Sequence, residues 1–181
     1  MDENLWLILI SYYEKSDGIL KISNKMVNRI ININSGVKQG GVLSPLLFNY
    51  FINELIEQII SEEGSSCLGN VKTSILAYCD DLILLSPSLK KIVKFVGICV
   101  DYSLKWMFYF NANKSLIMNC GFKLYENSQI KIRLGDNILK TKDTCKYLGL
   151  ILNENNDGNG MVIERFNQVR RRFVSLKSFG M

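Results

Sequence analysis

Two adjacent carboxylates, Asp80 and Asp81, are the residues of this sequence best suited to chemistry. They interrupt an otherwise apolar segment, 73–85, which predicts two strands buried on both faces and joined by a tight hairpin. Neighbouring negative charges beside an apolar core repel each other and lose hydration unless a cation neutralises them. Mg²⁺ prefers such hard oxygen ligands, completed by water and substrate phosphates. The pair therefore predicts a metal site for phosphoryl chemistry, and an exposed Asp-Asp turn without function is the alternative.

The composition excludes several other kinds of site. The 181 residues contain no histidine, which excludes Ser-His-Asp and Cys-His catalysis and histidine-ligated zinc. The five cysteines are odd in number and form no C-x-x-C pair, so we expect reduced, mostly buried thiols and not a disulfide-stapled scaffold. A chain that is 48% hydrophobic and 22% charged is typical of a folded globular domain.

The location of the protein follows from its short apolar runs and its first residues. No apolar run reaches the roughly 20 residues that a membrane helix needs. The start Met1-Asp2-Glu3 lacks the basic residues of a signal peptide. We therefore expect an intracellular protein of the nucleus, the cytoplasm or both, neither secreted nor a partner of membranes.

Positive charge is concentrated at the C-terminal end. Residues 1–160 carry 17 basic and 16 acidic side chains, whereas residues 161–181 carry five basic and one acidic. A nucleic acid is one partner that this segment predicts, and a solvated amphipathic helix without a partner is the alternative. The basic side chains of the segment are Arg165, Arg170, Arg171, Arg172 and Lys177.

The sequence predicts helices and strands both before and after the two carboxylates. The spacing of apolar residues, with Ser and Pro at helix starts, predicts helices at about 2–14, 46–60, 86–106 and from 161 onward. Runs rich in β-branched residues predict strands at 18–23, 26–34, 114–119, 129–134 and 146–152. The Asn- and Gly-rich segment 153–160 predicts a linker between a domain at 1–152 and a C-terminal helix at 161–181.

Four blocks of sequence occur in an informative order. They are 35–49 (Ser-Gly-Val-Lys-Gln-Gly-Gly-Val-Leu-Ser-Pro-Leu-Leu-Phe-Asn), 76–81 (Leu-Ala-Tyr-Cys-Asp-Asp), 110–115 (Phe-Asn-Ala-Asn-Lys-Ser) and 145–150 (Cys-Lys-Tyr-Leu-Gly-Leu). In this order they resemble motifs B, C, D and E of reverse transcriptases, especially those of LINE-type (non-LTR) retrotransposons. The resemblance implies an α+β polymerase palm with a central antiparallel sheet and helices on one face, followed by the start of a helical thumb.

The resemblance also implies the catalytic residues. Asp80 and Asp81 would hold catalytic Mg²⁺ (or Mn²⁺), with Asp81 closer to structural support than to direct chemistry. Lys114 would neutralise or protonate the departing pyrophosphate, although a lone lysine is otherwise an ordinary surface residue. The reaction would be RNA-templated DNA synthesis by two-metal nucleotidyl transfer.

Binding roles follow from the same resemblance, and the partners would be an RNA template, a DNA primer and a dNTP substrate. The residues that would face the template and the nucleotide are Gln39, Gly40 and Gly41, with Tyr78 beneath the primer terminus. The residues that would hold the primer and the duplex backbone are Tyr147, Leu148, Gly149, Arg170, Arg171 and Arg172. An ordinary strand-to-helix turn at 39–41 and core filling by Tyr78 are the alternatives. The aromatic residues Trp106, Phe108, Tyr109 and Phe110 are expected in the core and take no site.

A third carboxylate, which the family carries in motif A, has no counterpart before Ser35. Asp2 lies in a helix-start context and Asp17 in an Asp-Gly turn. We therefore expect an N-terminally truncated reverse transcriptase that begins just after motif A and is inactive alone. The other hypotheses are a non-catalytic nucleic-acid-binding remnant of a retroelement and an intron-maturase-like RNA-binding protein. The oligomeric state stays open.

Overall fold

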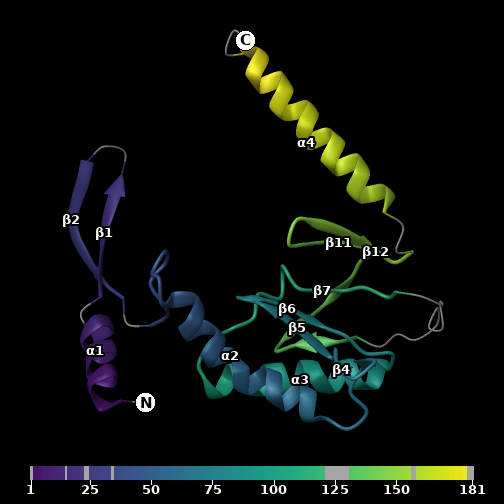
Figure 1. Cartoon of the computed structure of the whole chain (residues 1–181), viewed down its shortest axis with the longest axis horizontal. Coiled ribbons are helices and arrows are strands. Elements are labelled where there is room, and N and C mark those ends of the chain that lie inside the picture. Colours follow the sequence, from purple (N-terminus) through teal and green to yellow (C-terminus); the bar gives the residue numbers. More distant parts are fainter. Residues whose placement is uncertain are drawn as a thin grey trace. The chain divides into compact units, whose positions relative to one another are not determined.

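The computed structural model describes residues 2–14, 16–22, 25–33, 35–120, 131–155 and 158–178 (Figure 1). Within these ranges four helices alternate with short strands, so the expected α+β class is confirmed. The helices are α1 (Glu3–Glu14), α2 (Ser44–Ser61), α3 (Leu89–Lys105) and α4 (Asn159–Ser178). The strands are β1 (Asp17–Ile22), β2 (Lys25–Asn32), β3 (Cys67–Leu68), β4 (Val71–Lys72), β5 (Ile75–Tyr78), β6 (Asp81–Leu84), β7 (Leu116–Ile117), β8 (Arg133–Leu134), β9 (Asn137–Ile138), β10 (Lys140–Thr141), β11 (Thr144–Tyr147) and β12 (Leu150–Asn153).

The chain divides into two compact units, Met1–Glu54 and Leu55–Met181. The first unit, here unit 1, holds α1, the β1–β2 hairpin and the first part of α2. The second, unit 2, holds the rest of α2 and all later elements. The predicted division into 1–152, a linker at 153–160 and a helix at 161–181 stays a prediction. In the part of the chain that the structure describes, no helix has the length and apolar character needed to cross a membrane.

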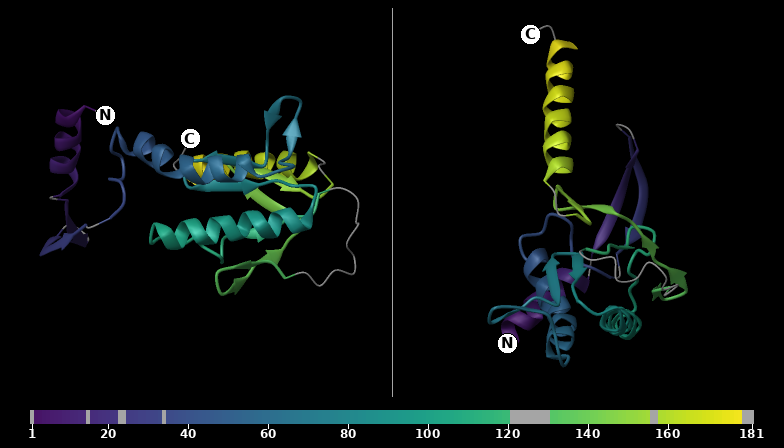
Figure 2. Two further views of the ribbon diagram at one scale, coloured as in Figure 1. Left: turned by 90° about the horizontal axis from the view of Figure 1, so that it is seen from below. Right: turned by 90° about the vertical axis from the view of Figure 1, so that its right-hand side faces the viewer.

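Strands pair two by two in the described ranges. Five of the pairs are antiparallel, and β10 pairs with β7 in parallel. The structure differs here from the expected central antiparallel sheet, because β5 and β6 are hydrogen-bonded only to each other. A hairpin forms its ladder between neighbours in sequence, whereas a third strand needs a long-range register of its own. Figure 2 shows the β1–β2 hairpin of unit 1 as a two-stranded ribbon.

α3 supplies most of the core of unit 2. Its amphipathic spacing, expected for 86–106, places Phe95, Val96, Cys99 and Tyr102 on one buried face. Other fully or nearly buried side chains of this unit are Leu55, Ile59, Ile75 and Ile132. An ion pair also connects α3 to the end of α2, because Lys94 of α3 pairs with Glu62, the residue directly after α2. Ser88, the residue before α3, has extended backbone angles as an N-cap does.

α3 ends in a Schellman turn at Trp106–Phe108. The Phe108 N–H donates to the Ser103 carbonyl over 3.0 Å, and Met107 between them has φ +53°. The Phe108 ring packs on Tyr102 and on Phe110, as the core expectation required. That expectation is wrong for Tyr109, which is 87% exposed, and for Trp106, which is 46% exposed.

Four other sequence predictions need correction. Segment 146–152, expected as one strand, crosses a hairpin, because the turn at 148–149 reverses the chain between β11 and β12. Of the expected strand at 114–119 only β7 forms, and the expected strand at 129–134 lies partly outside the described residues and otherwise contains β8. The five cysteines are unpaired as expected, but only Cys99 is buried.

Candidate functional site

The two carboxylates lie at the tip of the β5–β6 hairpin. Tyr78 pairs with Asp81 across the ladder, so Cys79 and Asp80 form a two-residue turn. Cys79 has φ +49°, whereas the φ of Asp80 is not positive. A positive φ at the first central position alone is the pattern of a type II′ turn, which normally takes glycine there. The turn places Asp80 at the tip and Asp81 at the start of β6, opposite the Tyr78 side chain.

Both carboxylates are exposed, contrary to the expectation of strands buried on both faces. Of β5 only Ile75 is buried, and Tyr78 is 60% exposed. The side-chain carboxylates of Asp80 and Asp81 make no hydrogen bond or ion pair with any residue that the structure describes. Their oxygens are therefore hydrated and open to a cation. In the described ranges no three His, Cys, Asp or Glu side chains cluster as a metal site.

The β11–β12 hairpin shares an electrostatic environment with this tip. Burial, and after it the negative charge of Asp81, raise the pKa of Tyr147. Leu148 (φ +48°) and Gly149 (φ +81°) form the turn of this hairpin, and two positive φ values are the pattern of type I′. The tertiary structure thus brings Tyr147, a predicted primer-binding residue, within the field of a predicted metal ligand.

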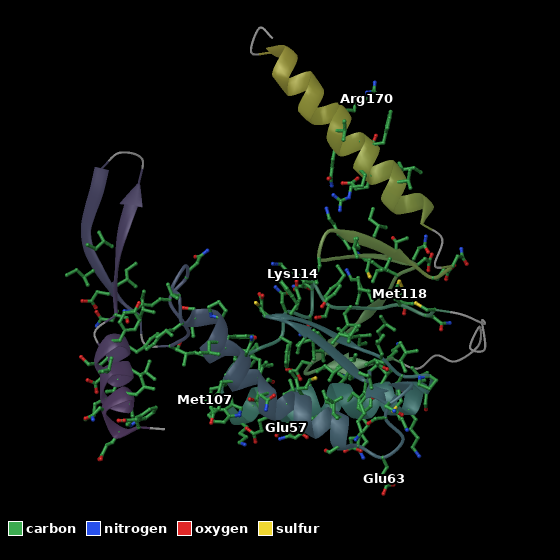
Figure 3. All side chains as sticks on the ribbon, viewed as in Figure 1. Glu57, Glu63, Met107, Lys114, Met118 and Arg170 are labelled. Atoms are coloured by element: carbon green, nitrogen blue, oxygen red, sulfur yellow. The ribbon has the colours of Figure 1, made fainter. Side chains whose placement is uncertain are left out.

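Lys114 is positioned by a turn that Asn111 organises. The Asn111 side-chain Oδ1 accepts from the N–H groups of Asn113 and Lys114 over 3.1 and 3.2 Å. The Asn111 carbonyl accepts from the Ser115 N–H and hydroxyl over 3.0 and 2.9 Å. This side-chain-capped turn holds Lys114 just before β7, where its side chain is exposed (Figure 3).

The glycine loop of unit 1 is a closed turn. The Gly41 N–H donates to the Lys38 carbonyl over 3.0 Å, and Gly40 has φ +78°, so Lys38–Gly41 is a type II turn with Gln39 at its corner. A Cβ at Gly41 would lie 2.6 Å from Ser44 Oγ, which explains the second glycine. Gln39 and Gly40 are exposed at the tip. The loop belongs to unit 1, and the carboxylates belong to unit 2.

Lys38 is a residue that sequence reasoning missed. Its Nζ lies 3.7 Å from the centroid of the Tyr12 ring and donates to the Tyr12 carbonyl over 2.8 Å. Nothing local in the sequence indicates this contact, because the two residues lie in different elements. The only available signal was the lysine at the middle of a glycine-rich loop.

The arginines of the C-terminal segment lie on α4. Arg165 and Arg170 are exposed, and Arg170 extends from the helix into open space in Figure 3. Arg171 and Arg172 belong to the same helix, but their side chains lie outside the described residues. The start of α4 lies against β12, since a Cβ on Gly160 would be 3.3 Å from Ile151 Cγ2. α4 therefore presents basic groups from an element anchored on the β11–β12 hairpin.

Comparison with known proteins identifies similar sequences. The family model described as "Reverse transcriptase (RNA-dependent DNA polymerase)" matches residues 4–152. Two polyproteins from Popillia japonica, each named "Retrovirus-related Pol polyprotein from type-1 retrotransposable element R2", are 42% identical over 65 residues and 35% identical over 89 residues, covering 35% and 49% of this chain. The "Retrovirus-related Pol polyprotein from type-2 retrotransposable element R2DM" of Drosophila melanogaster is 29% identical over 124 residues, 64% of this chain. This chain spans only 11–12% of the length of these polyproteins.

Proposed function

This chain belongs to the reverse transcriptase family, as found in non-LTR retrotransposons, and from that premise we propose that it forms part of an RNA-directed DNA polymerase palm. In this proposal the β5–β6 hairpin carries two of the metal-binding carboxylates of the polymerase. The single observation that supports it best is the exposed pair of carboxylates Asp80 and Asp81 at the tip of a tight hairpin. The helices would cover one face of a central palm sheet in the assembled polymerase.

The proposed ligands suit a divalent cation. Family members use divalent metals, and Asp80 and Asp81 offer hydrated carboxylate oxygens, which are the donors that Mg²⁺ or Mn²⁺ prefers. A cation bound there would supply charge neutralisation on the phosphates and a lower pKa for the primer hydroxyl. The chain's own side chains would orient the reactants: Tyr78 and Tyr147 would contact the primer end, and Lys114 would donate a proton to pyrophosphate.

Template and nucleotide would bind at the glycine loop. Its exposed backbone at Gln39 and Gly40 lets a nucleotide approach closely, because Gly40 carries no side chain there. RNA template, DNA primer and dNTP are the partners of this proposal. Leu148 and Gly149 would grip the primer strand, and Arg170 with its two neighbours on α4 would contact the duplex backbone.

Residues 1–181 by themselves should not extend a primer. Two-metal nucleotidyl transfer in this family needs a third carboxylate, and neither Asp2 nor Asp17 has the sequence context of motif A. On a poly-rA template with an oligo-dT primer and Mg²⁺, we expect no extension by the chain. Robust extension that Asp80→Asn abolishes would contradict our account of the third carboxylate. An in-frame aspartate motif in the genomic DNA upstream of Met1 would support the enzyme, and stop codons there would support the remnant.

Metal binding can be tested on the chain itself. Mn²⁺ should broaden the NMR signals of residues 78–81 and of Tyr147 selectively, and Asp80→Asn with Asp81→Asn should abolish this effect. Asp136→Asn is the matched control, because Asp136 is another exposed aspartate in a hairpin turn. Equal broadening in all variants would show that the pair is an ordinary exposed turn.

A nucleic-acid-binding protein without catalysis is the second candidate, and the exposed arginines of α4 favour it. Affinity for a primer-template duplex should fall steeply with salt, and the slope should drop when Arg170, Arg171 and Arg172 become alanine. Arg133→Ala is the control, since Arg133 is an exposed arginine of β8. Binding that prefers structured RNA over the duplex would instead support an intron-maturase-like role. An unchanged slope would indicate that α4 is a solvated helix that does not bind nucleic acid.

A further inference from the structure

We propose that Lys38 is a positioning residue, which fixes the glycine loop for nucleotide binding by holding its ammonium group on the Tyr12 ring at the end of α1. This inference rests on the proposed function, in which Gln39 and Gly40 face the template and the nucleotide. All the contacts that support it lie within unit 1. In this arrangement Lys38 contacts both the C-terminal end of α1 and the start of α2.

The side chain of Lys38 binds the C-terminal end of α1. Its Nζ lies 3.7 Å from the Tyr12 ring centroid and 5.6 Å from that of Tyr13, within the range of a cation–π interaction. The same Nζ donates to the Tyr12 carbonyl over 2.8 Å. The last four carbonyls of a helix have no partner within the helix, and the negative end of its dipole favours a cation. α1 has no basic residue of its own in the last turn of Glu3–Glu14, so Lys38 supplies this cation.

The main chain of Lys38 binds the start of α2. Its carbonyl accepts from the Gly41 N–H over 3.0 Å and from the Ser44 hydroxyl over 2.5 Å. Ser44 is buried, so this second bond is shielded from water. The residue is therefore held at both ends, by its side chain on α1 and by its carbonyl at α2.

This double attachment determines where the exposed tip of the loop lies. Gln39 and Gly40 follow Lys38 directly and occupy the corner of the type II turn that the Lys38 carbonyl closes. Releasing the ammonium group from Tyr12 would free the turn to rotate about the Lys38 backbone, while the turn itself stays closed. A nucleotide would then meet a less ordered loop. Ordering this loop would cost part of the binding free energy, so the affinity for the nucleotide would fall.

A direct contact between Lys38 and a phosphate makes a different prediction. If the ammonium group left Tyr12 to bind the nucleotide, the Tyr12 ring would compete with the nucleotide and its removal would strengthen binding. If Lys38 acts through its attachment, removing either member weakens binding to the same extent. The two roles therefore differ in the sign of the Tyr12→Leu effect.

The test uses the full 181-residue chain with Mn²⁺-dATP as probe and the NMR signals of Gly40 and Gly41 as readout. Lys38→Met and Tyr12→Leu should each weaken binding about threefold to tenfold, and the double variant should be no weaker than either single one. Lys38→Arg and Tyr12→Phe should retain binding, because each keeps a cation or a ring. Lys105→Met is the matched control, since Lys105 lies 5.2 Å over the Trp106 ring in unit 2.

A spectroscopic signature checks the attachment independently of binding and of any loss of folding. The ring current of Tyr12 should shift the ε-methylene protons of Lys38 upfield, and Tyr12→Leu should remove that shift. Binding by the wild-type chain together with unchanged binding by Lys38→Met would overturn the inference and leave the proposed function intact. Absence of binding by the wild-type chain would overturn the nucleotide role of the loop, and with it this inference, even if the upfield shift is present.

Discussion

Replacing Cys79 with glycine should raise the free energy of unfolding of unit 2. Cys79 is the first of the two turn residues between β5 and β6 and has φ +49°. The Cβ atom of an L-residue crowds the backbone in this region, and glycine has no such atom. The cysteine is exposed and makes no hydrogen bond with the residues that the structure describes, so its removal sacrifices no contact.

The expected gain follows from two opposing effects. Left-handed backbone is unfavourable by about 1–2 kcal/mol for a residue with a Cβ. Glycine also has more conformational freedom in the unfolded chain, which offsets about 0.4–1 kcal/mol. The difference between these ranges is about 0–1.6 kcal/mol, and their mid-values give a net stabilisation of about 0.8 kcal/mol. Cys79→Ala removes the thiol but keeps the Cβ, and should change the stability little.

Urea unfolding followed by tryptophan fluorescence measures this difference. The chain has two tryptophans, Trp6 in unit 1 and Trp106 in unit 2, so a Trp6→Phe background reports on unit 2 alone. For a denaturant slope of about 1–3 kcal/mol per molar urea, Cys79→Gly should raise the midpoint by about 0.2–1 M. Equal midpoints for the Gly and Ala variants would refute the reasoning, since the backbone conformation at position 79 would then carry no penalty.

Three further predictions concern the charge of Asp81, a buried thiol and a helical glycine. Asp81→Asn should lower the pKa of Tyr147 toward its ordinary value of 10.0, because the carboxylate contributes to raising it. A ¹³C-tyrosine NMR titration that finds no change would contradict this electrostatic effect of Asp81. Burial raises the pKa of Cys99 from 9.0 to about 12, so between these pH values the thiol ionises only in the unfolded state. The free energy of unfolding should therefore keep the full contribution of the buried thiol below pH 9.0 and fall as the pH rises toward 12. Iodoacetamide should modify the exposed Cys67 well before Cys99. A Cβ at Gly97 would meet no atom within 4 Å, so Gly97→Ala should stabilise α3 by about 0.5–1 kcal/mol in urea unfolding, and a loss of stability would show that this face is covered.

Local sequence rules were sufficient for the elements that carry the site. Helical spacing predicted α3, the Ser-Pro start predicted α2, and two apolar runs around Asp80 and Asp81 predicted the β5–β6 hairpin. Each of these depends on residues within a few positions of one another. Their secondary structure follows from turn chemistry, capping and periodicity, whatever the rest of the chain does.

The same rules did not predict which side chains of these strands are buried. The apolar segment 73–85, interrupted by Asp80 and Asp81, predicted strands covered on both faces, yet Leu76 is 44% exposed and Tyr78 60% exposed. Apolar composition states what a strand can bury, and only packing states what covers it. The carboxylates are consequently hydrated in this chain, and cation binding does not depend on rescuing buried charge.

The sequence by itself determined the family, the hairpin that presents Asp80 and Asp81, and the type of residue at each turn. Only the tertiary structure decided that Lys38 rests on the Tyr12 ring and that the charge of Asp81 acts on Tyr147. Turns and helices are fixed by interactions between near neighbours, which the order of residues records directly. Contacts between distant segments depend on how whole elements pack, because a side chain interacts with whatever the folded backbone brings within a few ångströms of it.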